Sequence, residues 1–156
     1  MTFTEYLKSI NACSDAVEWA ANKTVEEVVA TCHRGDWLLW LASKCDIGLQ
    51  PLTLAKGHCA NTVRHLMDDD RSLKAVDTAI AFGEGTATRE ELDAAYAAAD
   101  VAADAAAYAD AAAAAAAADA ADARDANRLQ TADICRQYIG DLIIQKVNSI
   151  TKPLNQ

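Results

Sequence analysis

Apolar residues recur every three or four positions along most of this 156-residue chain. That spacing is typical of helices that bury one face and expose the other. Over 37–44, Trp37, Trp40 and Leu41 fall on one such face, so both indoles can be buried together. Over 51–67, a second apolar stripe leaves polar side chains beside it. The pattern predicts a compact all-α domain built from many helices.

Capping boxes mark the starts of three predicted helices. Thr2, Thr24 and Thr88 are each followed three residues later by Glu, so hydroxyl and carboxylate can satisfy the first backbone N–H groups. The full pattern predicts helices over 4–11, 14–22, 25–33, 37–44, 51–67, 72–82, about 89–126 and 132–148. We expect a single helical domain over 1–148 and a frayed tail over 149–156.

The segment from Ala87 to Ala132 holds 25 of the 36 alanines in the chain. Because Ala has the highest helix propensity, the segment predicts one long amphipathic helix over about 89–126. At 100° per residue, five aspartates share one face of that helix: Asp93, Asp100, Asp104, Asp122 and Asp125. The opposite face consists of methyl groups, against which the last helix is expected to pack.

The net charge of −9 is unevenly divided: −4 over 1–86, −7 over 87–133 and +2 over 134–156. Direct nucleic-acid binding needs a basic surface, and an anionic membrane surface also favours one, so the charge argues against both partners. Five Cys without a CxxC pair favour reduced thiols. With no signal-peptide pattern at the start and no long apolar run, we expect a cytoplasmic protein.

The run from Cys32 to Trp37 (Cys-His-Arg-Gly-Asp-Trp) contains the densest group of reactive side chains. A nucleophilic Cys needs a His that meets it in space, and adjacent helical residues point in different directions. We therefore interpret Cys32 as buried and Asp36 as a helix cap. The paired spacings of zinc ligands and the Gly-rich loops of phosphate sites are missing from the sequence. We expect no catalytic site, metal or cofactor.

Cationic and aromatic side chains gather in the first half of the chain. The candidates for one pocket are Arg34, Trp37, Lys56, His58, Arg64 and His65. If the fold brings them to one groove, charge and ring stacking would hold a small anionic nucleotide-type ligand. The sequence alone does not show whether they converge.

The order of several motifs resembles one protein family. These motifs are Trp19-Ala20, Thr24-x-x-Glu27, Cys32-x-Arg34-Gly35-Asp36-Trp37-x-x-Trp40-Leu41, Cys59-Ala60, Val63-Arg64, Ala75-x-x-x-Ala79 and Ile134-Cys135-Arg136. In this order the chain, from about residue 10 to 139, is similar to the all-helical immunity proteins predicted in bacterial polymorphic toxin systems, which are also common in bacteriophage genomes. The segment from Arg34 to Trp37 is the most specific part of the resemblance.

The resemblance implies a non-enzymatic protein that binds and blocks a toxin. Under this hypothesis the aspartate face of the long helix meets a basic toxin or effector. The alternative is a phage counter-defence protein that sequesters a small anionic nucleotide-type immune signal in the basic and aromatic pocket. The alanine face also allows a homo-oligomer, because it permits close helix approach between two chains.

Overall fold

The structure, a computed structural model, describes residues 1–107 and 119–152, with residues 100–107 and 119–124 described by their helical backbone alone. Within these ranges the chain forms eight α-helices, one 3₁₀ turn and no strand, which confirms the predicted all-α fold. The helices are α1 (Phe3–Ser9), α2 (Ser14–Trp19), α3 (Val25–Thr31), α4 (Gly35–Lys44), α5 (Leu49–Asn61), α6 (Asp70–Gly83), α7 (Arg89–Ala107) and α8 (Asp119–Thr151), with η1 (Arg64–Leu66) between α5 and α6.

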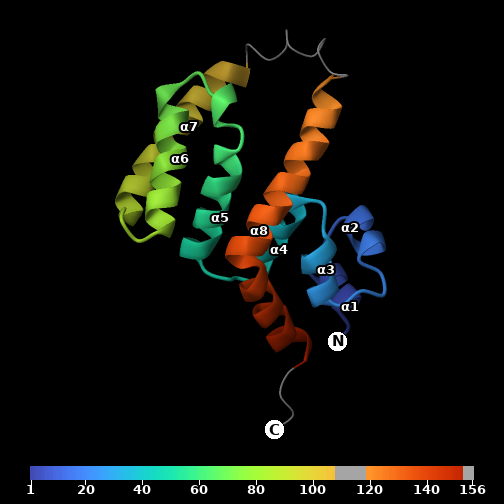
Figure 1. The fold of residues 1–156 in the computed structure, drawn as a ribbon. Helices are drawn as coiled ribbons and strands as arrows, with labels where there is room; N and C mark the ends of the chain where they lie inside the picture. The colour runs from blue at the N-terminus through green and yellow to red at the C-terminus, as the bar shows by residue number, and fades with distance from the viewer. Residues whose placement is uncertain (108–118, 153–156) are drawn as a thin grey trace.

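The long helix α8 lies at the centre of the fold (Figure 1). Its 33 residues give it a length of about 50 Å. A stripe of side chains along it is at most 1% exposed: Ala132, Cys135, Ile139, Ile143 and Val147. The helix packs on α3, α4 and α5, with a smaller contact to α1. Because the stripe follows the three- and four-residue spacing of one helix face, it supplies the core with a continuous apolar surface.

Helices α5, α6 and α7 form a second group beside α8 (Figure 1). Helix α5 packs on both α6 and α8, so it joins this group to the core. Two glycines allow α5 and α6 to approach each other closely. A Cβ added at Gly57 would lie 2.8 Å from Cγ1 of Ile80, and one at Gly83 would lie 2.4 Å from Cβ of Leu54.

Helices α4 and α8 approach closely at Gly35, the first residue of α4. A Cβ at Gly35 would lie 2.3 Å from Oγ1 of Thr131 and 2.6 Å from its backbone carbonyl carbon. The Cys135 Sγ also donates to the Gly35 carbonyl oxygen at 3.6 Å. The start of α4, which carries Asp36 and Trp37, is therefore held directly against α8.

The three predicted capping boxes are confirmed. In each box the Thr Oγ1 accepts from the N3 backbone N–H at 3.2 Å, and the Glu carboxylate accepts from the Thr backbone N–H at 2.7 Å. Several other boundaries differ from the prediction, and two of these differences matter most. Helix α4 begins at Gly35, so Asp36 lies in its first turn and is not its cap. The helix predicted over 51–67 ends at Asn61 and is followed by the 3₁₀ turn.

The prediction of one helix over 89–126 and a separate helix over 132–148 is wrong. Helix α7 covers Arg89–Ala107, and α8 runs without a break from Asp119 to Thr151. Helix α7 ends and α8 begins at the same end of the molecule, so the chain direction reverses between them (Figure 1). The sequence from Arg89 to Asp119 contains no Gly or Pro, and its alanines favour a helix whatever the context, so it gives no sign of two separate helices.

The predicted packing of the alanine helix and the predicted start of the tail also differ from the structure. Over the residues that are described, α7 packs on α6, whereas the final helix packs on α3, α4 and α5. Helix α8 continues past residue 149, and Thr151 is 7% exposed. The Thr151 carbonyl oxygen accepts from the Met1 amino group at 3.3 Å, so the two ends of the described chain meet.

Among the described helices, none combines the length and the apolar character that a bilayer crossing requires.

Candidate functional site

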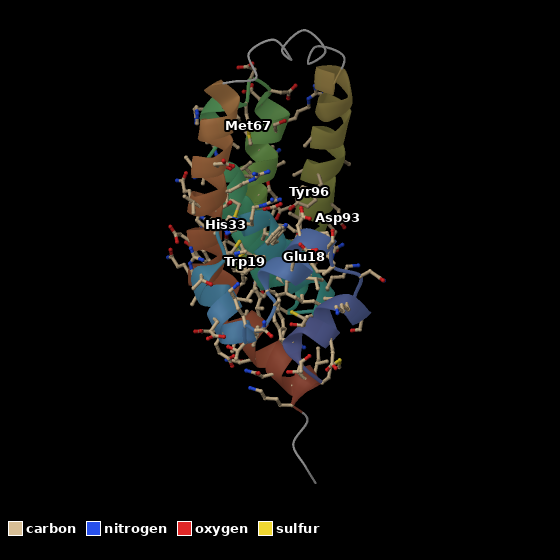
Figure 2. The ribbon with its side chains drawn as sticks, turned by 90° about the vertical axis from the view of Figure 1, so that its right-hand side faces the viewer. Glu18, Trp19, His33, Met67, Asp93 and Tyr96 are labelled. Carbon is tan, nitrogen blue, oxygen red and sulfur yellow. The ribbon has the colours of Figure 1, made fainter. Side chains whose placement is uncertain are left out.

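Three aromatic rings meet at the surface where α2, α3 and α4 come together. Trp19 is the last residue of α2, His33 lies in the loop after α3, and Trp37 lies in the first turn of α4. The ring centroids are 5.6 Å apart for Trp19 and His33, 6.1 Å for Trp19 and Trp37, and 6.0 Å for His33 and Trp37. Figure 2 shows Trp19 and His33 on neighbouring elements. His33 is exposed and both indoles are half-buried, so this aromatic cluster faces solvent.

Cations lie over the rings of all three Trp side chains. The pairs are Lys23 over Trp19 at 4.2 Å from the ring centroid, Arg34 over Trp37 at 4.8 Å and Lys44 over Trp40 at 5.7 Å. Such contacts stabilise exposed sites modestly, by about 0.5–1 kcal/mol each. Each indole therefore already has a cationic neighbour from this chain.

The Arg34 and Asp36 side chains form a bidentate ion pair. Nε of Arg34 donates to Oδ1 of Asp36 at 2.8 Å, and Nη2 donates to Oδ2 at 2.5 Å. These hydrogen bonds hold the pKa of the Asp36 carboxyl below its usual value. The Arg34 guanidinium thus contacts both the carboxylate and the Trp37 ring, which joins the charged and aromatic parts of the motif.

A cavity of about 390 Å³, here called the Trp cavity, lies beside the aromatic cluster. Its wall comes from α1, α2, α3, α4 and the loops between them, and includes Phe3, Leu7, Ala16, Trp19, Trp37 and Trp40. Most of the wall is apolar. Asp36 is the one charged residue in this wall, and its carboxylate is already paired with Arg34.

Cys32 is buried beside this cavity and forms no pair with His33. Its side chain is 1% exposed, its Sγ donates to the Arg34 carbonyl oxygen at 3.4 Å, and burial raises the pKa of its thiol. Arg136 of α8 covers the end of α3 by donating from Nη1 to the carbonyl oxygens of Val29 at 3.3 Å and Cys32 at 2.7 Å. Because the thiol is protonated and enclosed, the geometry favours a structural role for Cys32.

Of the other four pocket candidates, two contact residues of other helices and two are exposed. Arg64 pairs with Asp77 of α6. The ring of His58 stacks on Tyr138 of α8, with centroids 4.4 Å apart and planes at 8°. Lys56 and His65 are exposed. Of the six residues proposed for a basic and aromatic pocket, the structure brings Arg34 and Trp37 into contact, whereas His58 and Arg64 are held against other elements.

The aspartates predicted to share one helix face lie on two helices. Asp93 is on α7, where Oδ1 accepts from Nε of Arg89 at 2.8 Å, and Figure 2 shows Asp93 near Tyr96 on this helix. Asp125 is on α8 and pairs with Arg128 at 3.0 Å. Both carboxylates are well exposed, with side chains 59% and 71% accessible. The side chains of Asp100, Asp104 and Asp122 lie outside the described residues.

One shallow cavity brings residues from both predicted sites together. It has a volume of about 370 Å³ and is lined by His33, Arg34, Asp125, Arg128 and Leu129. One acidic side chain, Asp125, and two basic ones, Arg34 and Arg128, line it, so this part of the surface is not uniformly acidic. Leu129 is 53% exposed at its edge.

The five cysteines are free, and four of them are buried. Sγ of Cys59 lies 3.9 Å from Sγ of Cys135. The hydrogen bond between them lowers the pKa of Cys59 and raises that of Cys135. Burial raises the pKa of Cys45 to about 11. Over residues 1–107 and 119–152, no three His, Cys, Asp or Glu side chains are grouped as a metal site would need.

Two members of the aromatic cluster, Trp19 and His33, were not among the predicted site residues. They belong to separate elements, and no spacing in the sequence relates them. The available signal was compositional: Trp and Arg, which are both present in this part of the sequence, are enriched at binding surfaces.

No family model, curated protein or solved structure matches this chain. The functional argument therefore rests on the residues and their geometry.

Proposed function

We propose that this protein is a non-enzymatic binding protein that neutralises a toxin or effector by forming a stoichiometric complex with it. The observation that carries the proposal is the charge of segment 87–133, which contains ten acidic and three basic residues. The resemblance to immunity proteins supports the same function. A surface of this sign favours a basic partner, because complementary charge accelerates association and disfavours wrong partners.

The ion pairs within this segment leave its acidic character intact. Asp93 and Asp125 pair with Arg89 and Arg128, and all four side chains are at least 37% accessible. Exposed pairs of this kind typically contribute about 0–1 kcal/mol, so a partner's cations can compete for these carboxylates. The carboxylates of Asp93 and Asp125 are therefore available for binding.

The alternative of nucleotide sequestration finds less support in the geometry. Arg34 and Arg64 are each neutralised by a carboxylate of this chain, and His58 stacks on Tyr138. These contacts hold Arg34 at the start of α4, Arg64 against α6 and His58 against α8, so the three side chains are not gathered around one anion.

The test compares the wild type with a variant carrying Asp100→Asn, Asp104→Asn and Asp122→Asn. Each protein is incubated with cell extract, complexes are analysed by native mass spectrometry, and the affinity of the captured partner is measured at low and high salt. We expect a one-to-one complex whose affinity falls in the triple variant, together with a weaker salt dependence, because three of the attracting charges are removed.

A matched control removes the same charge elsewhere. Asp15, Asp46 and Asp141 are exposed and lie outside segment 87–133, so changing all three to Asn should leave the affinity unchanged. Equal affinities for the wild type and the Asp100, Asp104 and Asp122 variant would reject the acidic surface as the binding site. The absence of any protein complex would reject the inhibitor function itself.

A further inference from the structure

We propose that the Trp cavity is a binding site for a small, uncharged aromatic compound. The cavity is separate from the acidic segment, and this inference does not rest on the function proposed above. Its volume of about 390 Å³ lies in the range of about 300–1,000 Å³ that is usual for small-ligand sites.

The wall of the cavity favours a flat aromatic occupant. Trp19, Trp37 and Trp40 all line it, together with apolar side chains such as Phe3 and Leu41. Indoles bind other rings in offset or edge-to-face arrangements, which contribute about 0.5–1.5 kcal/mol beyond the burial of area. An aliphatic compound of the same size would not gain this contribution.

The charges around the cavity disfavour a cationic ligand. Lys23, Arg34 and Lys44 lie over the three indoles, where their positive charges repel a further cation. The Asp36 carboxylate would be the remaining attraction for a cation, and it accepts both hydrogen bonds from Arg34.

An anionic ligand is also disfavoured. The wall includes no Lys, Arg or His side chain, and its one ionised group is the Asp36 carboxylate. An anion would lose its hydration in a largely apolar space whose wall offers no cationic partner. The ligand class that remains is therefore aromatic and uncharged.

The cavity is open to solvent, so a ligand can enter it from the surface. Ala16 and Trp19 of the six-residue helix α2 form part of its wall, and none of the residues of α2 is fully buried.

The test uses quinoline, a flat aromatic compound that is uncharged at neutral pH. Binding to the ¹⁵N-labelled full chain is followed by the indole N–H signals of Trp19, Trp37 and Trp40, and by nuclear Overhauser contacts between quinoline and the Ala16 methyl group. We expect saturable shifts of these signals, and affinity at least about tenfold higher than for N-methylquinolinium or quinoline-4-carboxylate. No saturable shift up to the solubility limit, or equal binding of either charged analogue, would overturn the proposal.

A matched pair of variants locates the site. Ala16→Leu fills part of the cavity and should weaken quinoline binding by at least about tenfold. Ala30→Leu makes the same change at an exposed position of α3 outside the cavity and should bind as the wild type does. Equal effects of the two variants would place quinoline elsewhere and reject the site. If Ala16→Leu does not fold, the Overhauser contacts to Ala16 in the wild type decide, and their absence in saturated protein rejects the proposal.

The variant with Asp100, Asp104 and Asp122 changed to Asn is expected to bind quinoline unchanged. Loss of toxin or effector binding in that variant with retained quinoline binding would show that the two surfaces act independently. The failure of either proposal is thus distinguishable from the failure of the other.

Discussion

Gly35 lets the start of α4 lie against α8, because it has no side chain. This residue begins α4 and touches Thr131 of α8, and the residues that follow it are Asp36 and Trp37. Any side chain at position 35 would meet the backbone of α8, which cannot move aside as the end of a flexible side chain can. The sequence places this Gly at the start of a Trp-rich segment. It does not show that Gly35 touches Thr131, because the two residues are 96 positions apart.

We predict that Gly35→Ala lowers the free energy of unfolding by about 1–3 kcal/mol, since overpacking forces the α4–α8 contact apart. Urea denaturation followed by circular dichroism measures the change. Gly140→Ala in α8 is the matched control. Its Cβ would lie 3.1 Å from Cγ1 of Val29 in α3, a side-chain methyl. The better helix propensity of Ala offsets that crowding, so the control should stay within about 1 kcal/mol of the wild type. Equal stabilities of the two variants would contradict the prediction.

At the scale of the element, α8 does more than supply an apolar stripe. Its Arg136 completes α3 by donating to two carbonyl groups at the end of that seven-residue helix. Such carbonyls have no partner within their own helix, and a cation there also interacts favourably with the helix dipole. The use of Arg136 as a cap for another helix cannot be predicted from the sequence, because it depends on where α3 docks.

We predict that Arg136→Gln lowers the free energy of unfolding by about 1–2 kcal/mol, because the carbonyl oxygens of Val29 and Cys32 lose a charged donor. Asp133→Asn provides the control. Asp133 pairs with the same guanidinium, but its side chain is 76% accessible, so its loss should cost less than about 1 kcal/mol. Hydrogen exchange at the α3 amides should increase in the Arg136 variant alone. Equal losses of stability in both variants would mean that the ion pair, and not the cap, is the stabilising contact.

At the scale of the whole molecule, hydrogen-bonded carboxylates connect distant parts of the fold. Asn148 of α8 donates to Glu26 of α3, and Arg64 of η1 pairs with Asp77 of α6. These contacts lower the pKa of Glu26 and of Asp77, and hydrogen bonds from Arg71 lower the pKa of Asp69 to about 2. Groups with a lowered pKa in the folded state stabilise it above their usual pKa, and this contribution is lost as the pH falls.

We therefore predict that the free energy of unfolding decreases as the pH falls from about 5 towards 2. Urea unfolding at a series of pH values measures the slope. Asp69→Asn should reduce the slope, since it removes one of the groups with a lowered pKa. Asp68→Asn, an exposed neighbour with no ion pair among the described residues, should leave it unchanged. A stability that is constant or increases over this range would contradict the assignment.

The sequence by itself determined the helical class and the three capping boxes. These features depend on residues within a few positions of one another, so a short window of sequence contains their energetics. Only the tertiary structure decided that the alanine segment belongs to two antiparallel helices, that Asp93 and Asp125 lie on different helices, and that Trp19, His33 and Trp37 meet. Each of these depends on which distant surfaces pack together, and an alanine tract without a turn residue carries no local record of that choice.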